Sequence, residues 1–156
     1  MLYVDSSVLV KRYLDEPGSE VLRARLRRGD KLYTSALSYA EVLTVFGRRF
    51  RERLNSEDEF ESLHDSLRTD WLSLWNVLEV NAQVMAFVHD LVKHHSIKSA
   101  DAVHLSSALW LRSESRSLPE PFGGEIEVEF GVADKALARI AAVCGLAVFN
   151  LETRAS

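Results

Sequence analysis

The sequence is poor in the residues that mark several common classes of protein. Its single cysteine, Cys144, excludes an internal disulfide, and no Cys-x-x-Cys or His-x-x-x-His spacing indicates a zinc site. Neither of the glycine-rich patterns GxxxxGK and GxGxxG is present, so nucleotide-binding folds lack support. No apolar run approaches the length of a membrane span, and no basic region precedes the first apolar residues. We therefore expect a cytoplasmic protein without a membrane partner.

What remains is the composition of one ordinary globular domain. The 156 residues are 47% hydrophobic and 27% charged. We expect a single domain over residues 1–156, with a core over about residues 1–151 and a tail at 152–156. The formal net charge is −4, and setting aside the four acidic residues proposed below as metal ligands would bring it to about zero, so charge does not exclude a nucleic-acid substrate. Among the basic clusters Lys11 and Arg12 are preferred as phosphate contacts because they lie one to two helical turns beyond Asp5.

Short apolar runs alternate with amphipathic stretches along the chain. We expect strands at residues 2–4, 31–34, 76–80, 126–132 and 146–150, and helices at 7–14, 19–28, 38–54, 56–74, 81–95, 99–111 and 134–143. The polar stretch 113–124 is the one linker-like segment. Strands that alternate with helices in this way predict an α/β fold, with a mostly parallel sheet of four to five strands between two layers of helices.

Four acidic residues occupy positions for which folding alone has little use. Asp5 closes the first expected strand, Asp134 follows the fourth, Glu41 comes shortly after the second, and Asp101 opens a helix. In a parallel sheet the carboxyl ends of the strands gather ligands at one edge. Carboxylates that converge there repel one another unless a cation such as Mg²⁺ or Mn²⁺ neutralises them. Such a metal site typically serves phosphate chemistry.

Each acid also has a purely structural explanation. Ser38 and Glu41 have the spacing of a capping box. Asp101 in the first turn of a helix would complement the helix dipole, and Asp134 or Asp5 could cap the helix that follows it. The shared location of the four acids favours a common site over four separate caps.

Three polar side chains near these acids are candidates for substrate binding or for support of the ligands. Ser6 or Ser7 could donate to a phosphate oxygen or orient a ligand, and a helix N-cap is an equal alternative. His104 falls one turn after Asp101 and could reach the margin of the site. A packed or supporting histidine is favoured over a general base because the metal would already supply the nucleophile.

Two segments resemble a known family. The run VDSSVLVK from Val4 to Lys11 is similar to the opening of PIN-domain nucleases, and IKSADAVHLSSAL from Ile97 to Leu109 resembles the helix around that family's third acidic residue. Glu41, within SYAEV, matches the second acid. The resemblance runs from Met1 to about Leu151 and is greatest to the VapC-type toxins of bacterial and archaeal toxin–antitoxin pairs.

The resemblance has definite implications. It implies a PIN-like three-layer α/β/α fold and a Mg²⁺- or Mn²⁺-dependent endoribonuclease that hydrolyses phosphodiester bonds of RNA. Its catalytic and metal-binding residues would be Asp5, Glu41, Asp101 and Asp134. A cognate antitoxin protein and a homodimer are the expected partners.

One departure from the family affects the fourth acid. Family members often carry Thr or Ser two residues before this Asp, whereas Val132 precedes Asp134 here. The missing hydroxyl removes a possible contact to a ligand or water, so we expect weaker metal binding at Asp134 rather than loss of activity.

A non-catalytic or regulatory PIN-like protein-binding module is the alternative function. The apolar stripe formed by Phe60, Leu63, Leu67 and Trp71 would suit a homodimer face or an antitoxin groove. It would equally suit the protein core, which is the default expectation for residues at helical spacing. A small antitoxin gene beside this one would favour the toxin function.

Overall fold

The protein is built on a five-stranded sheet, in a computed structural model that describes residues 1–116 and 127–151. All neighbouring strands are parallel, in the order β3-β2-β1-β4-β5. The strands are β1 (Leu2–Val4), β2 (Leu32–Ser35), β3 (Asn76–Leu78), β4 (Glu129–Val132) and β5 (Ala147–Asn150). The predicted α/β fold with a parallel sheet is confirmed.

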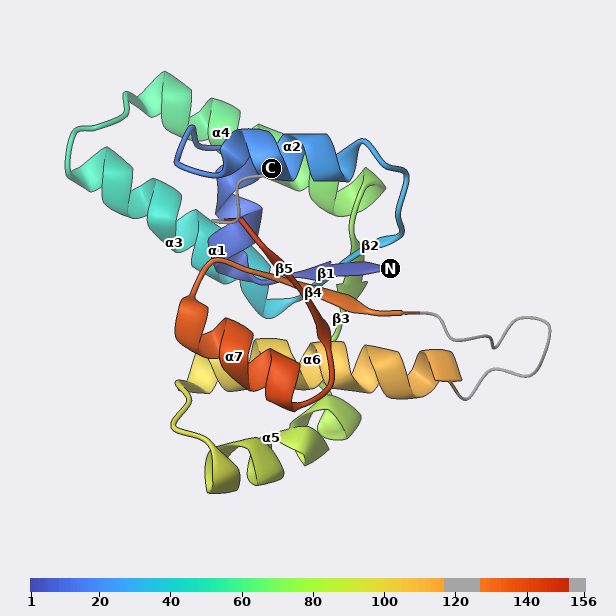
Figure 1. The fold of residues 1–156 in the computed structure, drawn as a ribbon. Helices are drawn as coiled ribbons and strands as arrows, with labels where there is room; N and C mark the ends of the chain where they lie inside the picture. The colour runs from blue at the N-terminus through green and yellow to red at the C-terminus, as the bar shows by residue number, and fades with distance from the viewer. Residues whose placement is uncertain (117–126, 152–156) are drawn as a thin grey trace.

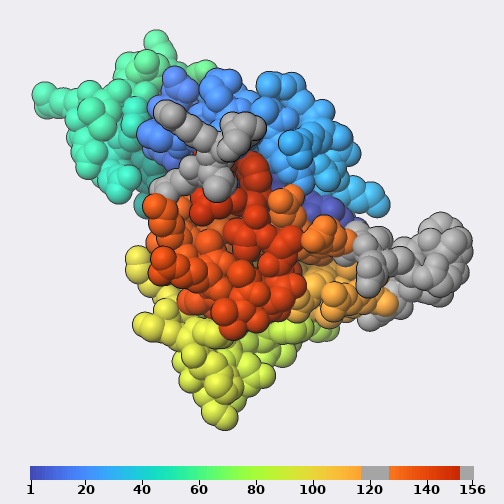
Figure 2. Space-filling model, in the orientation of Figure 1, coloured from blue at the N-terminus to red at the C-terminus, as the bar shows by residue number. Residues whose placement is uncertain are grey.

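Helices cover both faces of the sheet (Figure 1). One layer contains α1 (Ser6–Leu9), the 3₁₀ turn η1 (Val10–Arg12), α2 (Ser19–Leu26), α3 (Leu37–Arg51) and α4 (Glu57–Ser73), and the other contains α5 (Ala82–His94), α6 (Ser99–Arg116) and α7 (Lys135–Val143). Figure 2 shows one side of the molecule, where the orange and red surface of α7 and β5 lies between blue α2 and yellow-green α5. Within the described ranges, no helix combines the length and apolar character needed to cross a membrane.

Strand β1 divides its side chains between two separate cores. Leu2 and Val4 face the cluster of the α1–α4 layer, whereas Tyr3 faces the cluster of the α5–α7 layer, as the two-residue period of a strand requires. Tyr3 stacks on Phe130 of β4 with ring centroids 5.6 Å apart. Gly131 lets β4 approach β1 closely, because a Cβ at this position would lie 3.0 Å from Cγ1 of Val4.

Several boundaries differ from those predicted. The helix expected at 7–14 is a four-residue α-helix followed by η1, a tightening that is common at helix ends. Helix α6 continues to Arg116 instead of ending near 111, so the first residues of the expected linker are helical. The rest of that linker, residue 126 of the fourth expected strand, and the tail at 152–156 lie outside the described residues.

The apolar stripe of α4 belongs to the core. Leu67 is fully buried, and Phe60, Leu63 and Trp71 pack against the same cluster. Phe50 on α3 remains exposed. Core packing therefore accounts for most of this stripe, as the default expectation has it.

Candidate active site

Three of the four predicted acids lie at the carboxyl edge of the sheet. Asp5 directly follows β1, Asp134 comes two residues after β4, and Glu41 is on the second turn of α3, the helix that follows β2. Since β2, β1 and β4 are neighbours in the sheet, these three positions belong to one edge. Asp101, the third residue of α6, comes from the opposite helical layer.

Asp5 is a buried carboxylate held by local donors. Its side chain is only 4% exposed, and Oδ1 accepts hydrogen bonds from the Val8 amide at 2.9 Å and the Ser7 hydroxyl at 2.7 Å. Asp5 is therefore the N-cap of α1, a role that neither Ser6 nor Ser7 takes. Burial raises the pKa of Asp5 above its ordinary value despite these bonds, and the charge of Asp101 adds to the increase. The cap alone does not compensate for burial of this charge.

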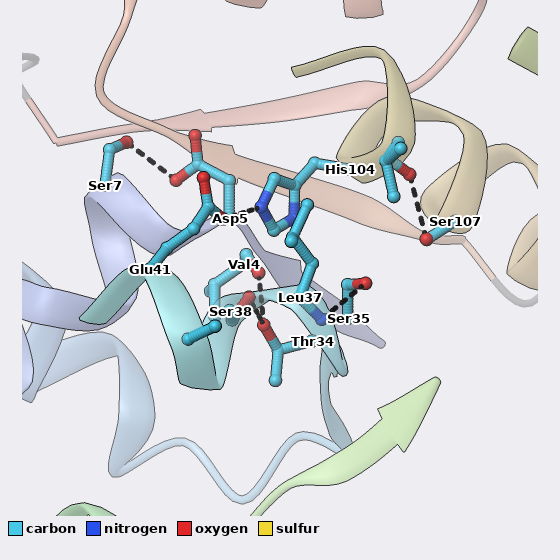
Figure 3. A network of polar contacts seen from close by, with 12 residues as sticks. Val4, Asp5, Ser7, Thr34, Ser35, Leu37, Ser38, Glu41, His104 and Ser107 are labelled. Atoms are coloured by element: carbon cyan, nitrogen blue, oxygen red, sulfur yellow. Dashed lines mark hydrogen bonds and ion pairs between the residues drawn. The ribbon is translucent and has the colours of Figure 1, made fainter. Parts of the chain in front are cut away.

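Glu41 points toward Asp5, and His104 approaches it from α6 (Figure 3). The Nε2 atom of His104 lies 2.7 Å from Oε2 of Glu41. Burial alone would raise the pKa of Glu41, but the hydrogen bond and charge of His104, with a contribution from Ser6, bring it below the ordinary value. Glu41 is thus ionised and accepts the hydrogen of Nε2.

The capping box that was the structural alternative for Glu41 does not form at the start of α3. Helix α3 has Ala36 as its N-cap residue and no side-chain capping bond. Ser38 instead exchanges a 2.7 Å hydrogen bond with Thr34 of β2, and Thr34 donates to the Val4 carbonyl at 2.9 Å. Glu41 is left to point into the site, which strengthens its assignment as a functional residue.

The charges of other acids affect the pKa of Asp101. Burial is the main cause that raises its pKa, and the charges of Asp134 and Glu41 raise it further, while Lys98 and His104 act in the opposite direction. Because Asp5 also experiences the charge of Asp101, the acids form one electrostatic cluster.

Asp134 is the most exposed of the four and has a clear structural role. Its carboxylate accepts a 2.8 Å hydrogen bond from the Leu137 amide and caps α7, as the structural explanation proposed. Val132 is fully buried in the apolar core of the α5–α7 layer. The side chain that replaces the family's usual hydroxyl therefore packs in the core.

The donor set suits a hard divalent cation. Within residues 1–116 and 127–151, no three His, Cys, Asp or Glu side chains stand close enough to hold a metal ion jointly. Asp5, Glu41 and Asp134 each accept hydrogen bonds from protein donors instead. The four carboxylates nevertheless offer only oxygen ligands and excess negative charge, which fits Mg²⁺ or Mn²⁺. Burial and the charges of neighbouring acids raise the pKa of two of them, Asp5 and Asp101.

A cavity of about 700 Å³ opens beside Glu41 and supplies cations that sequence reasoning missed. Its lining includes Ser6, Ser7, Glu41, Thr44, Arg48 and Lys98. Arg48 follows Glu41 by seven residues, which places both on one face of α3. Neither Arg48 nor Lys98 forms an ion pair within 4.0 Å with another described residue.

Lys11, for which a phosphate contact is predicted, has a partner within the protein. Its ammonium group pairs with Glu16 at 3.1 Å and does not line this cavity. Ser7, by contrast, contacts Asp5 and also accepts a 3.4 Å hydrogen bond from the Ala133 amide, so it links the loop after β4 to the buried acid.

Comparison with known proteins finds a matching family model and several relatives of this chain. A family model described as PIN domain matches residues 2–115. Ribonuclease VapC49 of Mycobacterium tuberculosis (strain ATCC 25618 / H37Rv) is 34% identical over 112 residues, which cover 70% of this chain and 75% of that protein. Ribonuclease VapC46 of the same strain is 31% identical over 107 residues, 69% of this chain and 73% of that protein.

Solved structures share the fold at low sequence identity. FitAcB from Neisseria gonorrhoeae aligns with a TM-score of 0.71 at 19% identity, covering 97% of this chain and 98% of its own. A toxin–antitoxin complex from Klebsiella pneumoniae aligns with a TM-score of 0.65 at 14% identity, covering 99% of this chain and 100% of its own. At such identities these structures show a common architecture.

Proposed function

Because the chain belongs to the PIN-domain family, we propose that it is a divalent-metal-dependent endoribonuclease with Asp5, Glu41, Asp101 and Asp134 as its metal ligands. The observation that supports the proposal is that three of these acids follow neighbouring strands at one sheet edge and that burial and the charges of neighbouring acids raise the pKa of Asp5 and Asp101. Relatives named ribonucleases, at 34% identity, support the nuclease activity.

Each acid would make a distinct contribution to the metal site. Asp5, Glu41 and Asp101 would hold Mg²⁺ or Mn²⁺, and Asp134 would complete the site directly or through water. When bound, the ion would lower the pKa of a water molecule and neutralise charge that develops on the scissile phosphate. Ser7 fixes the Asp5 carboxylate with a 2.7 Å hydrogen bond, so this ligand is oriented before an ion arrives.

The cavity beside Glu41 suits the phosphate backbone of RNA. Lys98 lies near enough to Asp101 to lower the pKa of that acid, so its charge would act close to the scissile phosphate. Arg48 is two helical turns from Glu41, roughly 10 Å along α3, and would contact a phosphate farther along the strand. Ser6 and Ser7 would add hydroxyl donors at the cavity wall.

We also propose that this nuclease is the toxin of a toxin–antitoxin pair, active as a cytoplasmic homodimer and inhibited by an antitoxin. Likeness to VapC ribonucleases and to a chain from a toxin–antitoxin complex supports this assignment. Met85 and Val92 on α5 are exposed apolar residues that a second copy of the chain would cover. Co-purification with the product of an adjacent small gene tests the antitoxin, and sedimentation equilibrium tests the dimer.

The nuclease proposal is tested by cleavage of total RNA with added Mg²⁺ or Mn²⁺ and with EDTA. Asp5→Asn is the diagnostic variant because asparagine retains the N-cap but loses the charge. We expect its cleavage rate to fall at least about 100-fold, the upper range for loss of a group that supports a metal ligand. Asp65→Asn, an exposed position on α4, is the matched control and should cleave normally.

Two results would count against the proposal. Cleavage that persists in EDTA would argue against metal dependence. Folded protein that cleaves no RNA with either metal, in the absence of an antitoxin, would favour the non-catalytic protein-binding module.

A further inference from the structure

We propose that Tyr3 and His104 form a positioning pair that orients the Glu41 carboxylate and thereby sets the affinity of the acid cluster for its metal ion. The Tyr3 hydroxyl is 3.0 Å from Nδ1 of His104, and Nε2 of His104 is 2.7 Å from Oε2 of Glu41. This inference rests on the metal-dependent function proposed above.

The protonation states follow from the partners. A carboxylate accepts hydrogen bonds, so Nε2 of His104 carries the hydrogen of the 2.7 Å bond to Glu41. The Tyr3 hydroxyl, 3.0 Å from Nδ1, can donate to a neutral imidazole or accept from a protonated one, so it holds this nitrogen in either state. The two bonds engage both ring nitrogens of His104, which fixes the orientation of the imidazole.

Packing holds the pair rigidly. Tyr3 is 0% exposed and His104 is 1% exposed. The Tyr3 ring stacks on Phe130 at 5.6 Å and meets the His104 ring edge-on, with centroids 6.2 Å apart. Neither ring can turn away without disturbing the core of the α5–α7 layer.

Glu41 needs such support more than the other buried acid does. Asp5 is short and is fixed by its own N-cap bonds. Glu41 has a longer side chain on the half-buried face of α3, and it would lose rotamer freedom on binding a metal ion. A carboxylate has about four lone-pair sites, so the bond from His104 leaves capacity for a metal while it restrains rotation.

A purely structural role would be the satisfaction of two buried polar side chains. That role requires the Tyr3–His104 bond but gives no reason for it to affect metal binding. Metal affinity measured without RNA therefore separates the two roles, because outer partners of metal ligands typically change affinity by about 10- to 100-fold.

The test is calorimetric titration with Mn²⁺ of the wild-type protein and of Tyr3→Phe, which retains the ring and loses the hydroxyl. We expect Tyr3→Phe to bind Mn²⁺ about 10- to 100-fold more weakly than wild type. Tyr39→Phe is the matched control, because the Tyr39 hydroxyl makes a similar bond to Nε2 of His64, 3.1 Å away, in the contact between α3 and α4. Its Mn²⁺ affinity should equal that of the wild type.

A second pair of variants keeps the test decisive if Tyr3→Phe folds poorly. His104→Gln retains an amide donor for Glu41 and should bind Mn²⁺ more tightly than His104→Leu. Equal Mn²⁺ affinity of Tyr3→Phe and Tyr39→Phe, or of the two His104 variants, would overturn the positioning role alone. Absence of Mn²⁺ binding by the folded wild-type protein would overturn the metal site and the positioning role together.

Discussion

Asp5→Asn should make the metal-free protein more stable at neutral pH. The Asp5 carboxylate is 4% exposed, and burial together with the charge of Asp101 disfavours its ionised form. Asparagine keeps a side-chain oxygen for the Val8 amide and is as good an N-cap as aspartate. The substitution therefore removes an unfavourable buried charge and retains the local hydrogen bond.

The stability that Asp5 contributes depends on pH, because its pKa differs between the folded and unfolded states. The pKa of Asp5 is raised in the folded state from its ordinary value of 3.8. The folded protein therefore binds this proton more tightly than the unfolded chain does, so the associated stability is fully present below pH 3.8 and is lost as pH rises through the folded pKa. Each pKa unit corresponds to about 1.4 kcal/mol, and each kcal/mol shifts the melting temperature of a chain of this size by about 2–4 °C.

Added metal should make the wild-type protein more stable than Asp5→Asn, the reverse of their order in EDTA. An ion that binds only the folded wild type at 100 times its Kd adds about 2.7 kcal/mol of stability, whereas Asp5→Asn should gain little. Thermal unfolding followed by circular dichroism gives the melting temperatures of wild type and Asp5→Asn. The measurements are made at pH 4 and pH 7.5, each with EDTA or with Mn²⁺. The reasoning is refuted if Asp5→Asn melts below wild type in EDTA at pH 7.5, because the charged carboxylate would then stabilise the fold. Asp65→Asn serves as the exposed control.

Three other substitutions test the substrate path, the fourth acid and the core. Arg48→Gln in a catalytically inactive background should weaken binding of single-stranded RNA and lower its log–log salt dependence by about 0.7, the effect of one lost phosphate contact, whereas Arg27→Gln should leave that slope unchanged. Asp134→Ala should lose about 1 kcal/mol of stability in urea unfolding because α7 loses its N-cap, while Asp134→Asn should keep that stability and still bind Mn²⁺ more weakly. Leu67→Ala, at a fully buried position, should lower the free energy of unfolding by about 2–5 kcal/mol. Leu72→Ala, at a position that is 79% exposed, should lower it by less than about 0.5 kcal/mol.

The sequence predicted those features that depend on local pattern and chain order. Strands alternating with helices were sufficient to predict a parallel sheet, and acids placed after the strands were predicted at one edge of it. The structure places Asp5, Glu41 and Asp134 at that edge and shows that Asp101 interacts with them electrostatically.

Features that depend on tertiary partners were beyond sequence reasoning. The pattern at Ser38 and Glu41 fits a capping box, but Thr34 and His104 compete for these side chains in the folded protein. Tyr3 gave no functional signal because an aromatic residue in a strand is expected in the core. Only the fold brings its hydroxyl to a histidine 101 residues away.

Which cations face the site also depends on tertiary contacts that the sequence does not reveal. Lys11 was preferred from its distance along the chain from Asp5, but it pairs with Glu16. Arg48 and Lys98 both follow Glu41 in the sequence but belong to different segments, and only the arrangement of α3 and α6 brings both to one cavity. A sequence shows which charges exist but not which of them are paired.

The most direct test of the central claim is anomalous diffraction from a crystal of the protein grown with Mn²⁺. We expect an anomalous peak coordinated by carboxylate oxygens of Asp5, Glu41 and Asp101, with Asp134 as a direct or water-mediated partner. A peak bound elsewhere, or none at this edge of the sheet at saturating Mn²⁺, would contradict the assignment of these acids as a metal-dependent nuclease centre.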